Sequence, residues 1–117
     1  MAALLGYYAY FKAWIFADFE NISPQEAYSL LTNSNDITLI DVRSKEAFQK
    51  DHIVNATSMP LAFLNEHNIS AKRVLVYSER GELSVEASRL LAKRGFEVLN
   101  LEGGVVFWIR AGYEMVE

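Results

Sequence analysis

The sequence has no cysteine among its 117 residues. It therefore forms no disulfide and offers no thiolate to a metal, and its only imidazole ligands are two histidines, His52 and His67. Two histidines separated by a helix-forming stretch do not supply the ligands of a structural zinc site. We expect no metal site and no other cofactor.

A basic cluster is also missing. Eleven Lys and Arg residues are outnumbered by fifteen Asp and Glu residues, which gives a formal net charge of -4, and the basic residues are scattered along the chain. A protein that binds DNA or RNA needs a concentrated basic face that displaces counterions from the phosphates. We therefore exclude nucleic acid as a partner.

Residues 1–17 are apolar, but they are too short for a comfortable bilayer span, which takes about 20 residues. They carry one charge, Lys12, and lack the basic start of a signal peptide. On a helix their small residues and their bulky residues form separate stripes, and a small stripe lets another backbone approach closely. The bulky residues include the aromatic side chains of Tyr7, Tyr8, Tyr10, Phe11, Trp14 and Phe16.

We expect residues 1–18 to form an apolar, aromatic helical segment. Three roles stay open for it: packing on its own domain or on a second copy, an interfacial membrane anchor that uses residues 1–17, or a targeting segment. Cytoplasmic residence is the default expectation, and membrane association is its alternative.

The remaining residues, 19–117, are predicted to fold as one α/β domain. A chain of 117 residues with 51% hydrophobic residues can bury one core and needs no second one. Apolar, β-branched runs alternate with segments of helical periodicity, which predicts a mostly parallel central sheet with helices on both faces. Helix signals include the capping box Ser23-Pro24-Gln25-Glu26 and the cationic, glycine-terminated end Lys93-Arg94-Gly95. Strands are predicted at 37–41, 74–77 and 97–101, and helices at 24–32, 45–51, 83–93 and after Gly104, with a short helical turn at 59–61.

The most informative local pattern is the loop that begins at Ser78. A buried strand stops there, and a helical pattern starts at Leu83 with Ala87 and Leu91 on the same face. A strand that feeds a tight loop and then a helix aims backbone N–H groups and the helix dipole at one point, which suits an anion or an activated nucleophile. Ser78 occupies the nucleophile position. A serine nucleophile needs a base that is oriented by a third group, and we do not expect His52 to be that base.

An ordered set of short motifs surrounds this loop, from about Asn21 to Met115. The motifs, in order, are Leu39-Ile40-Asp41-Val42-Arg43, Glu46, Phe48, His52-Ile53, Asn55-Ala56, Pro60-Leu61, Val76-Tyr77-Ser78, Gly95-Phe96, Leu101-Glu102-Gly103-Gly104, Trp108 and Ala111-Gly112-Tyr113. In order and spacing, this set resembles the rhodanese-like (thiosulfate sulfurtransferase) family. The chain departs from the family at the loop itself. The family's loop has the pattern Cys-x-x-Gly-x-Arg-Ser, of which Gly81 and Ser84 match, whereas Ser78 and Leu83 replace the cysteine and the arginine.

The resemblance implies an enzyme whose loop cysteine carries a persulfide, and this chain cannot perform that step. A serine hydroxyl is negligibly ionised near neutral pH and cannot hold a sulfane sulfur, although backbone N–H groups can satisfy it at little cost in stability. Glu79 and Glu82 flank Arg80 and are expected to oppose an anionic donor. Leu83 is expected to pack on a helix face.

The resemblance also places Asp41 and Arg43 beside the loop, at a strand end. We expect an internal ion pair, or hydrogen bonds that brace the loop, with Glu46 or the backbone as partners. Trp108 is expected to belong to the core.

Two functional hypotheses follow. In the first, the domain is non-catalytic and acts as a binding or regulatory module for a protein partner or for another copy of itself. In the second, it is a sulfurtransferase whose cysteine was replaced by serine at position 78, for instance to prevent oxidation. A third hypothesis, a cysteine-based phosphatase of similar topology, fails because its reaction needs the same missing thiolate.

Overall fold

The computed structural model describes residues 18–117, and the expected helix at 1–17 lies outside the described residues. The elements alternate along the chain, and strands β1, β5, β4, β2 and β3 lie side by side in this order in one sheet. All of the strand pairs are parallel. The strands are β1 (Glu20–Ile22), β2 (Ile37–Asp41), β3 (Thr57–Ser58), β4 (Arg73–Tyr77) and β5 (Glu97–Leu101), and the helices are α2 (Pro24–Asn33), α3 (Lys45–Lys50), the 3-10 helix η1 (Leu61–Glu66), α4 (Glu82–Lys93) and α5 (Gly104–Arg110).

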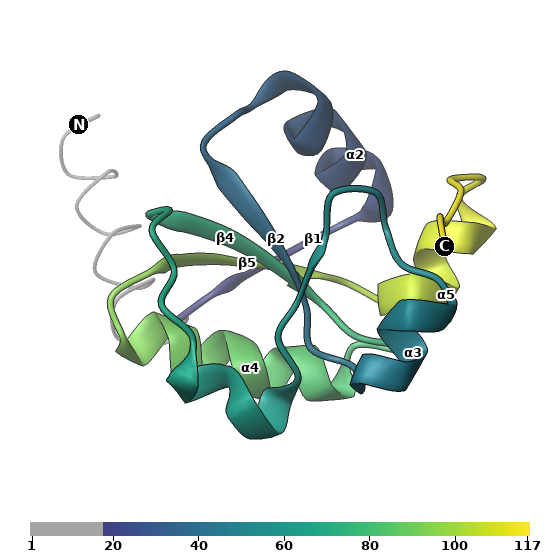
Figure 1. The fold of residues 1–117 in the computed structure, drawn as a ribbon. Coiled ribbons are helices and arrows are strands. Elements are labelled where there is room, and N and C mark those ends of the chain that lie inside the picture. The colour runs from purple at the N-terminus through teal and green to yellow at the C-terminus, as the bar shows by residue number, and fades with distance from the viewer. Residues whose placement is uncertain (1–17) are drawn as a thin grey trace, which may run out of the picture.

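Helices cover both faces of the sheet, as the sequence predicted (Figure 1). Neighbouring residues of a strand point to opposite faces, so Leu39 and Leu75 pack on one side while Ile40 and Val76 pack on the other. The first side is closed by α2 and α5, and the second by α4 and η1. Because both faces are buried, the central strands are mostly apolar, which is typical of parallel sheets.

The helix starts follow the capping signals in the sequence. Ser23 accepts a hydrogen bond from the N–H of Glu26, and the Glu26 carboxylate accepts one from the N–H of Ser23, so the predicted capping box is present at α2. Ser44 caps α3 through the N–H of Ala47. The predicted turn after Met59 is the 3-10 helix η1.

Two short strands were not predicted. Strand β1 spans only Glu20–Ile22, and β3 only Thr57–Ser58. Both lie at the edges of the sheet, where a strand has a single neighbour. Their strand conformation comes from pairing with β5 and β2, because segments this short hold no measurable periodicity.

None of the helices among the described residues has the length and apolar character that crossing a membrane requires. The expectations of cytoplasmic residence and of membrane contact through residues 1–17 stay predictions.

Trp108 belongs to the core, as expected. It is 3% exposed, its ring contacts that of Tyr113 at 4.8 Å between centroids, and its Nε1–H donates to the carbonyl of Glu114 at 3.2 Å.

We predict that Trp108→Ala lowers the free energy of unfolding by about 3 to 5 kcal/mol, because it leaves a large cavity. Chemical denaturation measures this change. On the same helix, Ile109→Ala removes a side chain that is 52% exposed and should stay within about 0.5 kcal/mol of the parent. Equal losses from both variants would contradict the core assignment.

Candidate functional site

The loop after β4 closes around the hydroxyl of Ser78. Ser78 Oγ accepts hydrogen bonds from the backbone N–H groups of Gly81 and Ser84, each at 3.1 Å. It donates to Ser84 Oγ at 3.1 Å, and Ser84 Oγ donates to the carbonyl of Gly81 at 3.1 Å. The expectation that backbone N–H groups satisfy this serine is confirmed. At 1% exposure, the hydroxyl lies inside the protein.

Ser78 also replaces the missing cap of α4. The N-cap residue is Gly81, which adopts a left-handed φ of 105° and has no side chain to bond the first helical turn. The N–H of Ser84 lies in that turn and has no partner within the helix, so it bonds Ser78 Oγ. A thiolate at position 78 would accept the same hydrogen bonds and would be stabilised by the helix dipole.

Helix α5 holds the loop from behind. The N–H groups of Val105 and Val106 donate to the carbonyls of Ser78 and Glu79, at 3.0 and 3.2 Å. This contact requires a glycine at position 104, because a Cβ there would overlap the carbonyl oxygen of Ser78. The Gly103-Gly104 pair therefore serves a close approach between two segments.

Several N–H groups of the loop remain available. Within residues 18–117, the N–H groups of Arg80, Glu82 and Leu83 donate no backbone hydrogen bond outside the regular elements and none to a side chain. They belong to the first turn of α4 or directly precede it, where helix N–H groups lack internal partners. This arrangement can hold an anion or a carbonyl oxygen.

Arg43 joins the loop to the sheet. Its Nε lies 3.1 Å from both carboxylate oxygens of Asp41, and its Nη2 lies 2.9 Å from Oδ2. Its Nη1 donates to Glu79 Oε1 at 3.1 Å, and its Nη2 donates to the carbonyl of Asp51 at 2.6 Å. One guanidinium thus connects the end of β2, the Ser78 loop and the end of α3.

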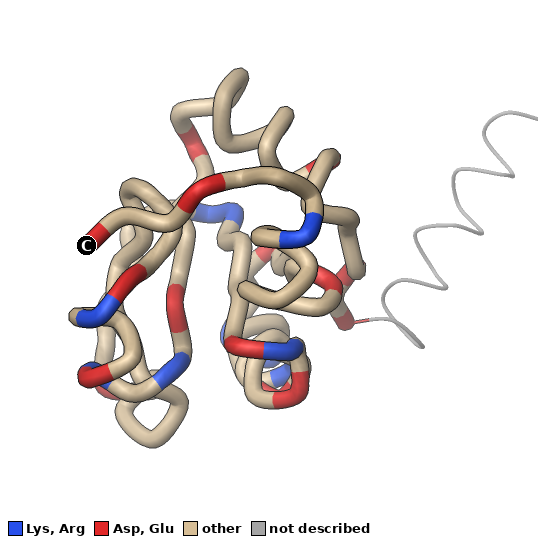
Figure 2. The backbone as a smooth tube through the Cα atoms, turned by 90° about the vertical axis from the view of Figure 1, so that its right-hand side faces the viewer, with Lys and Arg blue, Asp and Glu red and all other residues tan. Residues whose placement is uncertain are grey.

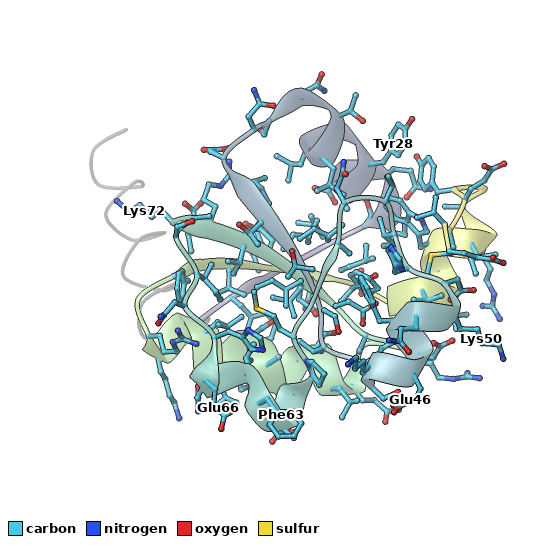
Figure 3. All side chains as sticks on the ribbon, in the orientation of Figure 1. Tyr28, Glu46, Lys50, Phe63, Glu66 and Lys72 are labelled. Atoms are coloured by element: carbon cyan, nitrogen blue, oxygen red, sulfur yellow. The ribbon has the colours of Figure 1, made fainter. Side chains whose placement is uncertain are left out.

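The expected Asp41–Arg43 ion pair is present. Of the two partners expected for it, the backbone is confirmed by the carbonyl of Asp51, whereas Glu46 is wrong. Glu46 is exposed on the outer side of α3, as Figure 3 shows. The further charged partners of Arg43 are Glu79, which lies 36 residues away in the sequence, and Asp51, whose Oδ1 lies 3.7 Å from Nη1. Such a distant pairing follows from the parallel register of β2 and β4, which brings Asp41 opposite Tyr77.

Burial and charge together set the protonation of this cluster. Burial acts to lower the pKa of Arg43, but hydrogen bonds to Asp41 and Glu79 outweigh it, so the pKa is raised and the guanidinium stays charged. For Tyr77, by contrast, burial raises the pKa well above its ordinary value, and the carboxylate of Asp41 raises it further. The Tyr77 hydroxyl accepts a hydrogen bond from the N–H of Ile53 at 3.1 Å.

The structure changes the expectation that Glu79 opposes an anionic donor at the loop. Its carboxylate pairs with Arg43, so its charge is compensated and opposes an incoming anion less than expected. Arg80 and Glu82 are exposed and make no ion pair within the described part of the chain. The loop rim therefore presents one charge of each sign.

The prediction that Leu83 packs on a helix face is wrong, because its side chain is 45% exposed. The sheet-facing side of α4 is formed by Ser84, Ala87, Ser88 and Leu91 instead. A hydrophobicity pattern overlooks the two serines, although the family pattern pointed to Ser84.

His52 plays no part at Ser78: its Nδ1 bonds the carbonyl of Phe48 at 2.8 Å, and its ring stacks on the Phe48 ring.

Comparison with known proteins identifies the family of this chain. A family model described as the rhodanese-like domain matches residues 23–111. The chain belongs to the rhodanese-like domain family. A protein named thiosulfate sulfurtransferase GlpE from Coxiella burnetii is 36% identical over 94 residues, which cover 77% of this chain and 87% of that protein. A protein named sulfurtransferase from Allochromatium vinosum is 30% identical over 90 residues, covering 74% and 84% of the two chains.

Solved structures agree with this assignment. The crystal structure of a rhodanese-related protein from Thermoplasma volcanium superposes with a TM-score of 0.73 at 25% identity, covering 84% of this chain and 98% of that one. A rhodanese-like domain protein from Staphylococcus aureus gives a TM-score of 0.70 at 26% identity, covering 85% and 97%. This chain thus keeps the fold of its relatives, although its own loop carries a serine at position 78.

We predict that Arg43→Met destabilises the protein by about 3 to 5 kcal/mol, because it leaves the fully buried Asp41 without its counter-charge. Adding Asp41→Asn should recover part of the loss. The matched control is Arg80→Met, which removes an exposed guanidinium and should change stability by about 0.5 kcal/mol at most. Urea denaturation measures all three variants. An Arg43→Met protein as stable as the Arg80→Met protein would show that Arg43 does not hold the loop.

The raised pKa of Tyr77 predicts a loss of stability in alkali. Above the ordinary tyrosine pKa of about 10, the unfolded chain releases this proton while the folded chain keeps it, so the free energy of unfolding falls as pH rises. Tyr77→Phe should be less stable than the parent at neutral pH, because it orphans the N–H of Ile53, but its stability should fall less steeply above pH 10. Denaturation curves from about pH 8 to pH 11 test this. Parallel pH profiles would contradict it.

Proposed function

We propose that this rhodanese-like domain is non-catalytic and acts as a binding or regulatory module. The observation that carries the proposal is the state of the Ser78 hydroxyl. This hydroxyl is buried, accepts two hydrogen bonds from backbone N–H groups and donates one to Ser84 Oγ. Such a group is neither accessible nor activated, and the chain has no cysteine to carry sulfur. Ser78 thus stabilises the loop rather than reacting.

The rim of the loop supports a role in binding a protein partner or a second copy. Leu83 and Phe107 are each 45% exposed. The Phe107 ring covers Gly103, whose backbone lies beside Gly81 of the loop, and Arg110 lies over the ring at 5.9 Å. Exposed aromatic and arginine side chains are typical of protein interfaces.

Nucleic acid does not fit this surface. Basic and acidic residues are interspersed along the described chain, as Figure 2 shows. The charges nearest the loop, Arg80 and Glu82, have opposite signs. A phosphate backbone would meet repulsion as often as attraction.

The second candidate function is that of a sulfurtransferase in which serine has replaced the loop cysteine. What favours it is the geometry around position 78, because the N–H groups of Gly81 and Ser84 would serve a thiolate as well as a hydroxyl. The relative from Coxiella burnetii, which is named thiosulfate sulfurtransferase GlpE, covers most of the domain.

Assays of thiosulfate:cyanide sulfur transfer distinguish the two candidates. We predict no turnover above background for the parent, and slow persulfide formation with weak turnover for Ser78→Cys, because the side chains of Leu83 and Glu82 add no cation to the backbone N–H groups that an anionic donor would meet. Mass spectrometry of the protein reports the added sulfur. Ser70→Cys, at an exposed position, controls for the reactivity of an ordinary thiol.

The double variant Ser78→Cys with Leu83→Arg should turn over faster than Ser78→Cys alone, since it restores a cation beside the loop. Turnover by the parent would refute the non-catalytic proposal outright. Robust turnover by Ser78→Cys alone would favour the sulfurtransferase candidate, because the rest of the site would then be complete.

A further inference from the structure

A cavity of about 410 Å³ lies between helix α2 and the segment that follows α3, which Figure 1 shows beside each other above the sheet. Its floor is formed by Leu39, Ile53 and Trp108 of the core. One of its walls is the face of α2 that carries Tyr28 and Leu31, three residues apart on the helix. Among residues 18–117, its lining includes none of the loop after β4, so the cavity is separate from the site described above.

The opposite wall is a tight turn. The N–H of Ala56 donates to the carbonyl of Ile53 at 3.0 Å, and Asn55 has a φ of 69°. A positive φ at the third residue is typical of a type II turn, and asparagine tolerates it better than most residues. The turn is fixed at its base, because the N–H of Ile53 donates to the buried hydroxyl of Tyr77 at 3.1 Å. Val54 and Asn55, at its tip, therefore hold a defined position at the cavity.

Two apolar side chains in the walls remain about half exposed. Val54 is 56% exposed, and Tyr28 is 48% exposed. Turns favour polar residues, glycine and proline, so an aliphatic side chain at the tip of this turn is unusual. The floor is already buried and gains nothing from a ligand, whereas the two wall residues lose contact with water when a ligand lies between them. The apolar contribution to binding thus comes from Val54 and Tyr28.

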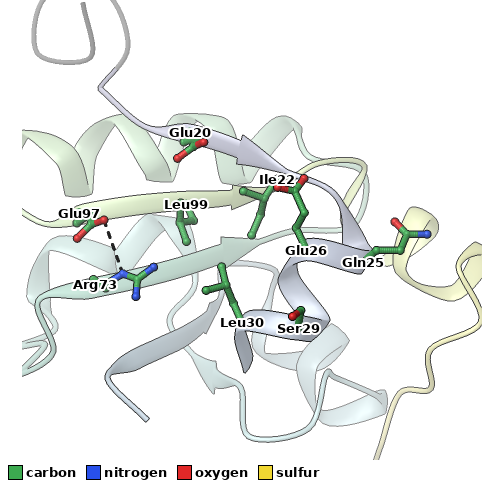
Figure 4. A pocket seen from close by; sticks show the side chains of 9 residues that line it. All are labelled: Glu20, Ile22, Gln25, Glu26, Ser29, Leu30, Arg73, Glu97 and Leu99. Atoms are coloured by element: carbon green, nitrogen blue, oxygen red, sulfur yellow. Dashed lines mark ion pairs between the residues drawn. The ribbon is translucent and has the colours of Figure 1, made fainter. Parts of the chain in front are cut away.

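The lining of the cavity carries no formal charge. Within the described chain, no Asp, Glu, Lys or Arg residue lines it. The groove at the amino edge of the sheet differs, because Glu20, Arg73 and Glu97 line that groove, as Figure 4 shows. Burying an ion without a counter-charge is costly, so the cavity beside the turn favours an uncharged ligand.

Several polar groups of the lining are available to a ligand. Ser34, Asn35 and Asn55 line the cavity, and their side chains make no hydrogen bond within residues 18–117. A carboxamide side chain offers two donors and one acceptor oxygen. It pairs with a ligand edge that also carries a donor beside an acceptor, as in a primary amide or a nucleobase. A few such groups among apolar side chains are typical of sites that fix the orientation of a small molecule.

We propose that this cavity binds an uncharged aromatic ring whose edge carries an amide-like pair of donor and acceptor. The ring lies between Val54 and the face of α2 that carries Tyr28 and Leu31, and its polar edge bonds the side chains of Asn35 and Asn55. The volume of about 410 Å³ falls in the range of roughly 300 to 1,000 Å³ that small-molecule sites occupy. This binding involves no residue of the loop after β4 and is independent of the function proposed for that loop.

Three compounds of nearly equal size and different charge test the proposal: benzamide is neutral, benzoate is an anion and benzamidinium is a cation. Each is titrated into the ¹⁵N-labelled protein at neutral pH, and NMR follows the Val54 backbone N–H and the Trp108 indole N–H. Because benzamide is small, we expect its shifts to saturate in the millimolar range. The two ions should bind at least about tenfold more weakly, since the lining offers them no counter-charge. The backbone N–H of Phe63, which lines a separate groove between α3 and η1, should not shift.

Variants at the tip of the turn locate the binding. Asn55→Gly keeps the left-handed turn but removes the amide, and it should weaken benzamide binding about three- to tenfold. Val54→Ser removes an apolar contact and should weaken binding roughly fivefold. The matched control is Phe63→Ser, which changes a residue of similar exposure in the other groove and should leave the affinity unchanged. All three side chains are exposed, and thermal melting confirms that the variants are folded.

Three results would overturn the proposal. The first is a benzamide titration in which neither Val54 nor Trp108 shows a saturable shift. The second is equal affinity for benzamide, benzoate and benzamidinium, because the lining would then not select by charge. The third is an unchanged affinity in both turn variants, which would place the compound elsewhere on the protein.

Discussion

The guanidinium of Arg43 is the point on which the arrangement of the functional loop depends. Only 6% of this residue is exposed, and its charge is balanced by Asp41 at the end of β2 and by Glu79 in the loop. Removing a charge from water is costly unless pairing and hydrogen bonding are complete. The loop therefore cannot shift away from β2 without leaving a buried charge uncompensated. The carbonyl of Asp51 completes the coordination and brings the end of α3 into the same cluster.

The chemistry of the loop depends on one atom, whereas its shape does not. Ser78 Oγ occupies a position at which two N–H groups and the amino end of α4 converge. The same convergence lowers the pKa of a thiol and activates it, but it leaves a hydroxyl un-ionised. Serine thus keeps the hydrogen bonds that hold the loop and forfeits the ability to carry sulfur. The rhodanese-like fold is thus compatible with a serine at this position, because the fold does not depend on the reactivity of one side chain.

The parallel sheet separates two potential contact surfaces. Loops that follow the strands gather at the carboxyl edge, where α5 packs against Ser78 and Glu79. The strand starts gather at the amino edge, where Glu20, Arg73 and Glu97 line a groove beside α2. Because all strand pairs are parallel, the two edges are formed by different segments and can be altered independently.

The sequence alone determined much of this protein, because capping boxes, apolar strand runs and glycine-terminated helices are encoded by neighbouring residues. It also showed the loss of the nucleophile, since Ser78 stands within a recognisable loop pattern. The tertiary structure decided what depends on distant residues. Only the parallel register of β2 and β4 brings Glu79 to Arg43, and only packing decides that α4 turns Ser84 and Ser88 inward while Leu83 faces solvent. Strand pairing likewise created β1 and β3, because segments of two or three residues have no conformational preference strong enough to act alone.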